Sequence, residues 1–522
     1  MRSRLIRVMG AFAIALMALY LPVQAEVTTA WVKTYDGDLD PPRFNSANEL
    51  AIDNQGNIYV TGFAQTHDID YDYDVVTIKY LPDGSVGWTA IYDGPSNISE
   101  MGNNLVVTGD GEVYVAAQVY DYNDGSDHGN DFLIIKYLPN GDTAWARQYN
   151  GDSNTHDYIY DLEVTAAGEV YAVGYCDTSY LATFKYSPSG DLLWMRKYRP
   201  AEGKAFGGSV EIDDVGNVYV CGGQYLPAGP YYNPGLVLVY SSTGDTLGIH
   251  TYEIPGTLSV SFSQSVLKNG YLYVAGTCYR QDTDVDFYLM KMALNGDTLW
   301  TRAYDGGSQV SLQRSDWFRF LTVDDEGNAF MTGNSYGKGH DFATIKYSLD
   351  GDLLWVSRYD YKGYDDDPSS MAVDVSGSIY LSGYSERAYG KGDFFTIKLN
   401  ADGTAAWARR YSPGDYYNCG NDVGVDGSGN VYAAGYSHST YDGKYFTVIK
   451  YSPTETILGD ADGDGNINLA DAVFLIGYIF KGGPAPDPLD SADANCDSNV
   501  NLADAMFLIN YIFKGGSPPN CM

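Results

Sequence analysis

The sequence predicts an all-β fold followed by a small helical unit, and three observations support this prediction. A unit of 49 to 57 residues, marked by a tryptophan, is repeated over most of the chain. Each unit contains four short runs of alternating apolar side chains, separated by Gly, Asp, Asn and Pro, as expected for strands and tight turns. Tyrosine is abundant, with 48 copies. A repeat of this length with four strands is typical of a β-propeller blade.

The repeat is clearest in residues 341–360, which read DFATIKYSLDGDLLWVSRYD. The tryptophans that mark the period are Trp31, Trp88, Trp145, Trp194, Trp300, Trp355 and Trp407, with Gly248 in the place of a missing one. In the last copy, strands are expected over residues 421–426, 429–435 and 445–451, and a tryptophan-containing strand such as 407–411 follows each copy. Asp-x-x-Gly-Asn segments predict tight turns between the first two strands, and Pro-Asp-Gly-like segments predict tight turns before the fourth.

The order of the copies predicts a closed ring. The chain has an unpaired fourth strand at residues 31–35, and its eighth unit ends at Tyr451 without a following tryptophan strand. The early strand can complete the last blade, which would pair both free sheet edges. We therefore expect eight blades over residues 27–455. Seven blades are the alternative, because the unit at residues 207–255 is the weakest copy.

These segments resemble the bacterial β-propeller repeat family, whose typical copy reads GNVYVTG followed by DFATIKYSPDGNLLW. The matching segments here are GNVYAAG at residues 429–435 and DFATIKYSLDGDLLW at residues 341–355. The resemblance implies the fold and says almost nothing about activity.

The connections from second to third strand and from fourth to first are long and variable, and they share one face of the predicted ring. They interleave Tyr with Asp, which gives flat amphipathic surfaces beside hydrogen-bond acceptors. These connections include residues 65–73, 120–130, 224–234, 361–367 and 412–418. This rim is a candidate site for a glycan or a peptide. The alternative is that Tyr and Asp are the ordinary composition of solvated extracellular loops.

The sequence assigns no catalytic residue. The six histidines lie in different blades without metal-ligand spacing, and the GxSxG match at residues 333–337 falls between two strands rather than at a strand-to-helix elbow. Four cysteines occupy different blades, and the sequence leaves open whether they pair or are buried as small apolar residues. They are Cys176, Cys221, Cys278 and Cys419.

Residues 1–25 are predicted to be an export signal. Three arginines precede an apolar run, and VQA at residues 23–25 is a small-residue cleavage site. No later apolar stretch is long enough to span a bilayer. Removal of the three arginines would change the net charge from −35 to −38. The export signal predicts a secreted protein. Because so acidic a chain repels nucleic acid and anionic membranes, we expect neither as a partner.

Residues 457–522 differ in composition and contain two calcium-loop motifs. Oxygen-bearing side chains alternate along a twelve-residue loop, and Gly465 lies at its sixth position, where the loop turns. The predicted ligands of the first loop are Asp460, Asp462, Asp464, Asn466 (through its carbonyl), Asn468 and Asp471. Those of the second loop are Asp493, Asn495, Asp497, Asn499 (through its carbonyl), Asn501 and Asp504. Ca²⁺ prefers about six to eight oxygen ligands at this spacing, so two ions are expected.

Each loop leads into an amphipathic helix. The first helix is expected over residues 469–480, with an apolar face of Val473, Phe474, Ile476, Ile479 and Phe480. NLADAVFLIGYIFKGG in the first half becomes NLADAMFLINYIFKGG in the second. Two such loop–helix halves, each without the entering helix of an EF-hand, closely resemble a type I dockerin domain over residues 457–522.

This resemblance implies docking to a cohesin module on a scaffold or cell surface. In that family the residues just before loop position 12 help to select the cohesin and are commonly a Ser-Thr pair. Here they are Leu469-Ala470 and Leu502-Ala503, which puts a cellulosome-type partner in doubt and indicates a more apolar contact. Because the two halves agree at these positions, we expect that either half can make the contact.

The two calcium loops are expected to differ. The second has three carboxylates instead of four, and Ser498 replaces the glycine at position six. A non-glycine residue forced to positive φ costs on the order of 1 kcal/mol, so the second loop is predicted to bind Ca²⁺ more weakly. Cys496 and Cys521 are predicted to form a disulfide that ties the chain end to the second loop.

These features predict a secreted, non-catalytic adaptor, in which the propeller presents a binding rim and the dockerin attaches it to a scaffold or cell surface. One alternative is a dockerin-borne enzyme of polysaccharide catabolism, either a hydrolase of O-glycosyl bonds or a lyase. A purely architectural surface protein is the other.

Overall fold

The computed structural model describes residues 27–519, except for residues 38, 40–42, 68–71, 95–98, 121–128, 153–154, 228–232, 255–256, 281–283, 307–314, 338, 439–442, 454–457, 463–465, 485, 487–488 and 498. The predicted export signal lies outside the described residues. The chain divides into two compact units. Of the described residues, the larger unit comprises 31–450, and the smaller comprises those from 451 onward together with 27–30. Within the described part, no helix is both long enough and apolar enough to cross a membrane.

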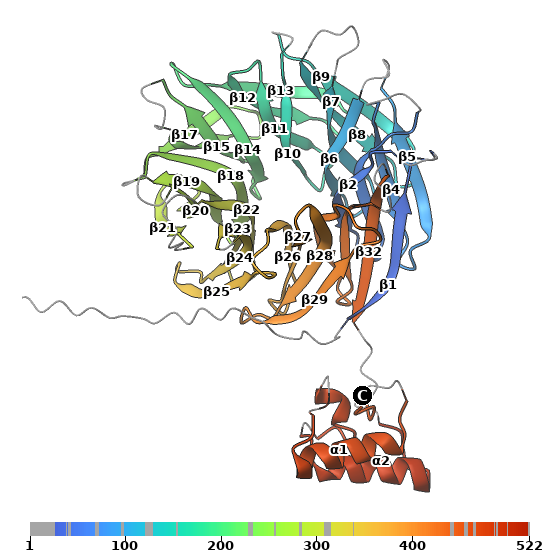
Figure 1. Cartoon of the computed structure of the whole chain (residues 1–522). Helices are drawn as coiled ribbons and strands as arrows, with labels where there is room; N and C mark the ends of the chain where they lie inside the picture. Colours follow the sequence, from blue (N-terminus) through green and yellow to red (C-terminus); the bar gives the residue numbers. More distant parts are fainter. Residues whose placement is uncertain are drawn as a thin grey trace, which may run out of the picture. The chain divides into compact units, whose positions relative to one another are not determined.

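The larger unit consists of eight four-stranded sheets, which surround a common centre as the blades of a ring (Figure 1). Blade 1 contains β2 (Ser46–Ile52), β3 (Ile58–Ala64), β4 (Asp74–Tyr80) and β5 (Val86–Tyr92). Blade 2 contains β6 (Ser99–Val107), β7 (Val113–Tyr120), β8 (Asn130–Tyr137) and β9 (Thr143–Tyr149). Blade 3 contains β10 (Tyr158–Val164), β11 (Val170–Cys176), β12 (Tyr180–Tyr186) and β13 (Leu192–Tyr198). Blade 4 contains β14 (Lys204–Ile212), β15 (Val218–Tyr225), β16 (Gly235–Tyr240) and β17 (Thr246–Tyr252).

The second half of the ring repeats this order. Blade 5 contains β18 (Ser259–Lys268), β19 (Tyr271–Arg280), β20 (Asp284–Ala293) and β21 (Thr298–Tyr304). Blade 6 contains β22 (Asp316–Val323), β23 (Ala329–Tyr336), β24 (His340–Tyr347) and β25 (Leu353–Tyr359). Blade 7 contains β26 (Asp366–Val373), β27 (Ile379–Ala388), β28 (Lys391–Leu399) and β29 (Ala405–Tyr411). Blade 8 contains β30 (Cys419–Val425), β31 (Val431–His438), β32 (Lys444–Pro453) and β1 (Val27–Tyr35).

The ring closes between the two ends of the propeller sequence. The strand order of blade 8 is β1-β32-β31-β30, so the first strand of the described chain pairs with the last (Figure 1). The predicted eight-bladed ring is confirmed, and the seven-bladed alternative is wrong. The weak copy near residues 207–255 forms a complete blade although its sequence has diverged, because β15 and β16 stay buried as the inner strands and β14 and β17 alternate buried or half-buried with more exposed positions.

The period of the tryptophans has a structural cause. The indole nitrogen of Trp88, in blade 1, donates a hydrogen bond to the Pro139 carbonyl of blade 2 at 3.1 Å. Gly141 of the same turn has φ of 90°, and a Cβ there would lie 2.8 Å from the Trp88 ring. The tryptophan therefore fixes one blade to the third-to-fourth-strand turn of the next. The same contact joins Trp31 to Gly84, Trp145 to Gly190, Trp194 to Gly244, Trp300 to Gly351 and Trp355 to Gly403.

The blade without this tryptophan uses a different side chain. Gly248 occupies the tryptophan position, and the ring of His250, two residues later, lies against Gly296 of the next blade. The hydroxyl of Tyr252 also donates to the Gly296 carbonyl at 3.0 Å. An aromatic contact between blades is thus retained where the sequence marker is lost.

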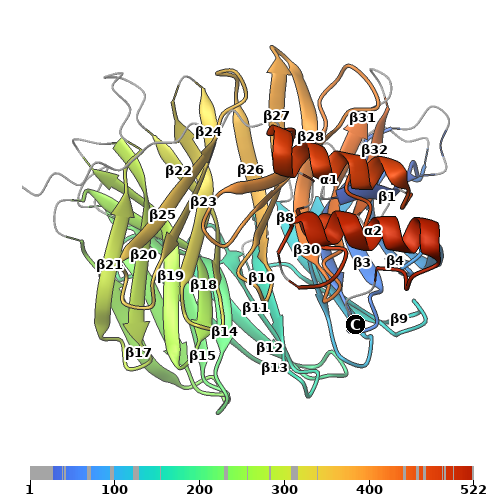
Figure 2. The same ribbon diagram turned by 90° about the horizontal axis from the view of Figure 1, so that it is seen from below.

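The smaller unit consists of α1 (Leu469–Lys481), the 3₁₀-helix η1 (Leu489–Ala492) and α2 (Leu502–Lys514), with α1 and α2 side by side (Figures 1 and 2). Its core is formed by small and branched apolar residues from both halves. They are Ala461, Ala472, Leu475, Ala492, Ala494, Ala505 and Leu508. The predicted apolar face of the first helix is corrected at Val473 and Phe480, which are 59% and 62% exposed, because the core is built around Ala472 and Leu475 instead.

The propeller cysteines confirm the simpler of the two interpretations. Cys176, Cys221 and Cys278 are buried and Cys419 is half-buried, and all four are free thiols. Burial raises the pKa of each thiol. They therefore act as small apolar core residues rather than as reactive groups.

Candidate calcium-binding and docking site

The first calcium loop is organised around the carboxylate of Asp471, which is fully buried at the start of α1. One of its oxygens accepts hydrogen bonds from the backbone N–H groups of Ala461 at 2.8 Å and Asp462 at 3.2 Å. The other accepts from the N–H of Asn468 at 2.7 Å. These bonds fold the loop back on the helix, and carboxylate oxygens of Asp460, Asp462 and Asp471 lie within 4.8 Å of one another. Three converging carboxylates are a donor set that suits Ca²⁺.

The second loop repeats this arrangement around Asp504, which is also fully buried. Its oxygens accept from the N–H groups of Asn495 at 3.2 Å and Asn501 at 2.8 Å. Burial raises the pKa of Asp504, and the nearby charges of Asp493 and Asp497 raise it further. Where the first loop has Asp462, the second has Asn495, whose amide donates to Asp497 at 3.2 Å. One repulsion between acids is thereby replaced by a hydrogen bond.

Two of the predicted ligands also cap the helices. The side-chain oxygen of Asn468 accepts a hydrogen bond from the N–H of Ala470 at 2.8 Å, and Asn501 makes the same bond to Ala503. The capping explains why asparagine stands at position nine of both loops. Among the other predicted ligands, Asp464 lies outside the described residues. Asn466 and Asn499 are described, and their roles as carbonyl ligands stay predictions.

The second loop also contains a non-glycine residue with left-handed backbone. Cys496, at loop position four, has a φ of 63°. Residues other than glycine rarely adopt this conformation, because their Cβ atom is crowded by the backbone. Ser498, where the strain was predicted, lies outside the described residues. Cys496 is bonded in a disulfide. Its predicted partner, Cys521, lies outside the described residues, so this pairing stays a prediction.

Each helix presents an apolar stripe to solvent, and the two stripes match. In α1 the stripe consists of Leu469, Val473 and Phe480, exposed to 47%, 59% and 62%. In α2 it consists of Leu502, Met506 and Phe513, exposed to 42%, 62% and 63%. Residues four and seven apart lie on the same side of a helix, so each set forms one stripe. The predicted contact residues Ala470 and Ala503 are exposed at the start of each stripe.

On the propeller, the face predicted as a rim carries carboxylate clusters at three junctions between blades. Two of these clusters consist of three aspartates whose carboxylate oxygens lie within 4.8 Å of one another. One is formed by Asp286, Asp305 and Asp316, and the other by Asp341, Asp360 and Asp366. The third cluster has a histidine in place of one aspartate and consists of His67, Asp74 and Asp93. In each cluster one aspartate lies among the first three residues of the third strand of a blade, and another follows its fourth strand. The sequence analysis missed these clusters, because their members come from separate connections.

Two of the three clusters contain arginine. Arg358 lies 2.8 Å from Asp341, and Arg280 pairs with Asp286. Burial raises the pKa of Asp341, and the neighbouring Arg358 opposes that rise. In each of these two clusters one aspartate is therefore paired with a cation inside the protein, which is a structural role.

Comparison with known proteins identifies the smaller unit. Residues 458–513 match the model of the dockerin type I domain. The chain thus carries a type I dockerin domain together with an eight-bladed β-propeller, and type I dockerins bind calcium. No curated protein matches the sequence.

Several solved structures resemble the propeller. A protein of unknown function from Dyadobacter fermentans is 11% identical, with 83% of this chain and 100% of that chain covered and a TM-score of 0.39. The polysaccharide lyase Uly1 is 10% identical, with 78% and 90% covered and a TM-score of 0.40. The β-propeller domain of the trilobed protease from Pyrococcus furiosus is 8% identical, with 70% and 97% covered and a TM-score of 0.40. These similarities carry no argument about activity.

Proposed function

We propose that the protein is an extracellular, non-catalytic adaptor whose dockerin attaches the propeller to a cohesin module in the presence of calcium. The observation that carries this proposal is the pair of matched apolar stripes on α1 and α2. Each stripe exposes three large apolar side chains directly after a calcium loop. Exposed apolar surface of this kind marks an interaction site, and its duplication would let either helix contact the same partner.

Calcium would make the stripes available by fixing the loops. Asp471 and Asp504 connect each loop to the first turn of the following helix. An ion bound to the carboxylates would therefore hold the orientation of Leu469 and Leu502, the first residues of the two helices. We propose two ions, one per loop, with weaker binding in the second loop because it has fewer carboxylates and a strained Cys496.

Binding to immobilised cohesins tests this proposal. Leu469→Asp and Leu502→Asp place a charge on either stripe at the first helical position, where an acidic residue favours the helix. Each single variant is expected to lose less than about tenfold in affinity, and the double variant to lose binding altogether. Lys514→Gln, an exposed change outside the stripes, serves as the control.

Three outcomes contradict parts of this proposal. Failure of the calcium-loaded protein to bind any cohesin of a panel of scaffold and surface types would overturn the docking function. Loss of all binding in one single variant would show that only one helix makes the contact. Release of sugar products from purified polysaccharides by the full chain would favour the alternative, a dockerin-borne enzyme of polysaccharide catabolism.

The ligand of the propeller rim is a separate part of the proposal. A glycan or peptide would meet aromatic surfaces such as Tyr384 and Tyr417, whose rings stack at 5.0 Å between centroids. Tyr417 is 46% exposed and lies in the connection at residues 412–418. Glycan-array screening of the full chain, with Tyr417→Ala as the variant, tests this site. Equal binding by both proteins would exclude Tyr417 from the site.

A further inference from the structure

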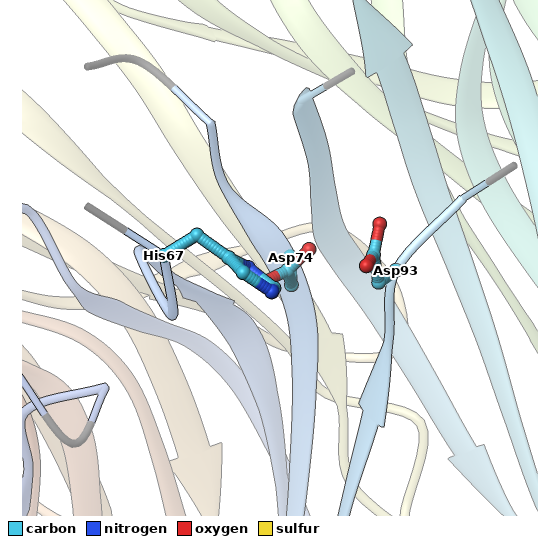
Figure 3. Close-up of side chains that lie close together, drawn as sticks. All are labelled: His67, Asp74 and Asp93. Carbon is cyan, nitrogen blue, oxygen red and sulfur yellow. The ribbon is translucent and has the colours of Figure 1, made fainter. Parts of the chain in front are cut away.

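The cluster at the junction of blades 1 and 2 brings together side chains from three connected strands. His67 follows β3, Asp74 begins β4, and Asp93 follows β5 (Figure 3). Potential ligand atoms of all three lie within 4.8 Å of one another, and Nδ1 of His67 lies 3.6 Å from Oδ2 of Asp74. Asp74 lies between the other two side chains, with one carboxylate oxygen on the side of Asp93 (Figure 3).

The buried carboxylate of Asp74 is incompletely satisfied. Asp74 is fully buried, and its Oδ2 accepts a hydrogen bond from the Thr66 hydroxyl. Its Oδ1 is also buried, and no described residue donates a hydrogen bond to it. The same is true of Oδ1 of Asp72, which is 4% exposed. A buried carboxylate oxygen without a donor costs free energy unless another group or an ion compensates it.

Further acidic side chains lie close to this carboxylate. Glu100 of β6 is 1% exposed and lies close to the same acids. Its acidic neighbours are Asp74, Asp93 and Asp72. Within the described part of the chain, no lysine or arginine pairs with any of these four acids.

Equivalent aspartates in other blades show what is missing here. In blades 6 and 7, the aspartate equivalent to Asp74 accepts a hydrogen bond from an arginine that lies 17 positions later, on the fourth strand. Arg358 donates to Asp341 at 2.8 Å, and Arg410 donates to Asp393 at 3.0 Å. In blade 2 the equivalent Gln148 donates to Asp131 at 2.7 Å. In blade 5 that position is Ala303, and Arg280 pairs with Asp286 instead.

In blade 1 the position is Ile91, which is 45% exposed and supplies neither charge nor donor. One oxygen of Asp341 also lacks a hydrogen-bond partner among the described residues, but its second oxygen is paired with Arg358. The acids of blade 1 have only the partly exposed His67 as a neighbouring group that can carry positive charge, among the residues that the structure describes. The arginine that pairs with the equivalent aspartate in blades 5, 6 and 7 has no counterpart here among the described residues.

We propose that His67, Asp74 and Asp93 bind a divalent metal ion at the junction of blades 1 and 2, with the buried carboxyl groups of Asp72 and Glu100 close by. The ion would take the place that arginine occupies in blades 5, 6 and 7. Mixed imidazole and carboxylate ligands suit Mn²⁺ or Zn²⁺ better than Ca²⁺, which prefers oxygen ligands alone. This site is distinct from the dockerin loops, because all of its ligands belong to the propeller.

The proposal is tested by counting ions bound to the full chain after treatment with chelator and dialysis. Mn²⁺ binding is followed by electron paramagnetic resonance, and Zn²⁺ binding by calorimetry. Asp74→Asn is expected to bind one ion fewer than the wild type and to lose the rise in propeller melting temperature on addition of the ion. Asp131→Asn, the equivalent change in blade 2, is expected to behave as the wild type does.

A second variant guards against a folding defect in Asp74→Asn. His67→Gln changes a side chain that is 46% exposed, and it is expected to weaken Mn²⁺ and Zn²⁺ binding by at least tenfold without altering the metal-free melting temperature. Equal ion counts for the wild type, Asp74→Asn and His67→Gln would overturn the site. Binding of Ca²⁺ alone, unaffected by His67→Gln, would overturn the assignment of His67 as a ligand.

Discussion

The junction of blades 1 and 2 and the junction of blades 6 and 7 place acids at equivalent positions of the repeat but neutralise them differently. At the second junction, Arg358 pairs with Asp341 inside the protein. At the first, Ile91 stands where the arginine would be, and Asp74 faces His67. Since unpaired buried charge is costly, an acidic cluster on this scaffold is stabilised by a bound proton or by a cation, which comes from a side chain or from solution. The contrast suggests that loss of one arginine can turn a structural cluster into a metal site.

Removal of calcium from the dockerin should have the largest effect, because the acids of its loops depend on an ion instead of a side chain. Chelation is expected to unfold the smaller unit, with loss of the circular dichroism signal of the two 13-residue helices. Calcium at a thousandfold excess over Kd contributes about 4 kcal/mol to folding. An unchanged helical signal in chelator would show that the unit does not depend on the ion.

Replacement of the internal cation should have the next largest effect. Arg358→Met leaves Asp341 buried without a charge partner and is expected to lower the free energy of unfolding of the propeller by about 3–5 kcal/mol. Ile91→Met, at the equivalent position, is expected to change it by less than about 0.5 kcal/mol because no charge partner is lost. Urea denaturation of both variants measures the difference. Equal effects would remove the basis of the comparison.

Insertion of an arginine at the first junction should replace the proposed metal ion with an internal cation. Ile91→Arg is expected to place a guanidinium group beside Asp74 and to raise the metal-free free energy of unfolding by about 1.5–3 kcal/mol. The variant should also lose the increase in melting temperature that Mn²⁺ or Zn²⁺ gives the wild type. Thermal unfolding with and without each ion measures both effects. A variant that still responds to the ion would show that the introduced guanidinium group does not replace it.

Per pH unit, the pH dependence at the second junction should be the smallest effect. Burial raises the pKa of Asp366 to about 7, against 3.8 for the ordinary carboxyl group. The folded protein then holds a proton that the unfolded chain has released, so the stabilising contribution is complete below about pH 4 and is lost as pH rises through 7. The loss is roughly 1 kcal/mol per pH unit in that window. Asp366→Asn should remove this slope, and urea denaturation at pH 5, 6 and 7 would show whether it does.

The fold was largely predictable because its signals are local and repeated. The tryptophan marks a contact with the next blade, and the Asp-x-x-Gly-Asn segments form tight turns, as where Asp53 accepts hydrogen bonds from the N–H groups of Gln55 and Asn57 at 2.9 Å. Residues 31–35 predicted ring closure, because an unpaired strand at one end matches a missing strand at the other. The calcium-loop motifs were recognisable for the same reason, since the predicted ligands of each lie within twelve consecutive residues.

The helix surface and the propeller clusters were less predictable because they depend on neighbours distant in sequence. Val473 and Phe480 are apolar, yet both are exposed to solvent, because the small core is formed by Ala472 and Leu475 on another side of the helix. His67, Asp74 and Asp93 look like three ordinary polar residues of separate connections. A comparison of residues 17 positions after each repeated aspartate would have distinguished Ile91 from Arg358, but its meaning depends on knowing that the two strands pair.

The sequence by itself determined the eight-bladed repeat, the closure of the ring and the two calcium-loop motifs, because each is encoded in short segments that recur at a fixed spacing. Only the tertiary structure decided which acids are neutralised and which apolar side chains remain exposed. The free energy of a buried carboxylate depends on groups brought near it by folding, such as the arginine beside Asp341 and its absence beside Asp74. Exposure likewise depends on which side of a helix the core occupies, and amphipathic composition alone does not fix that choice.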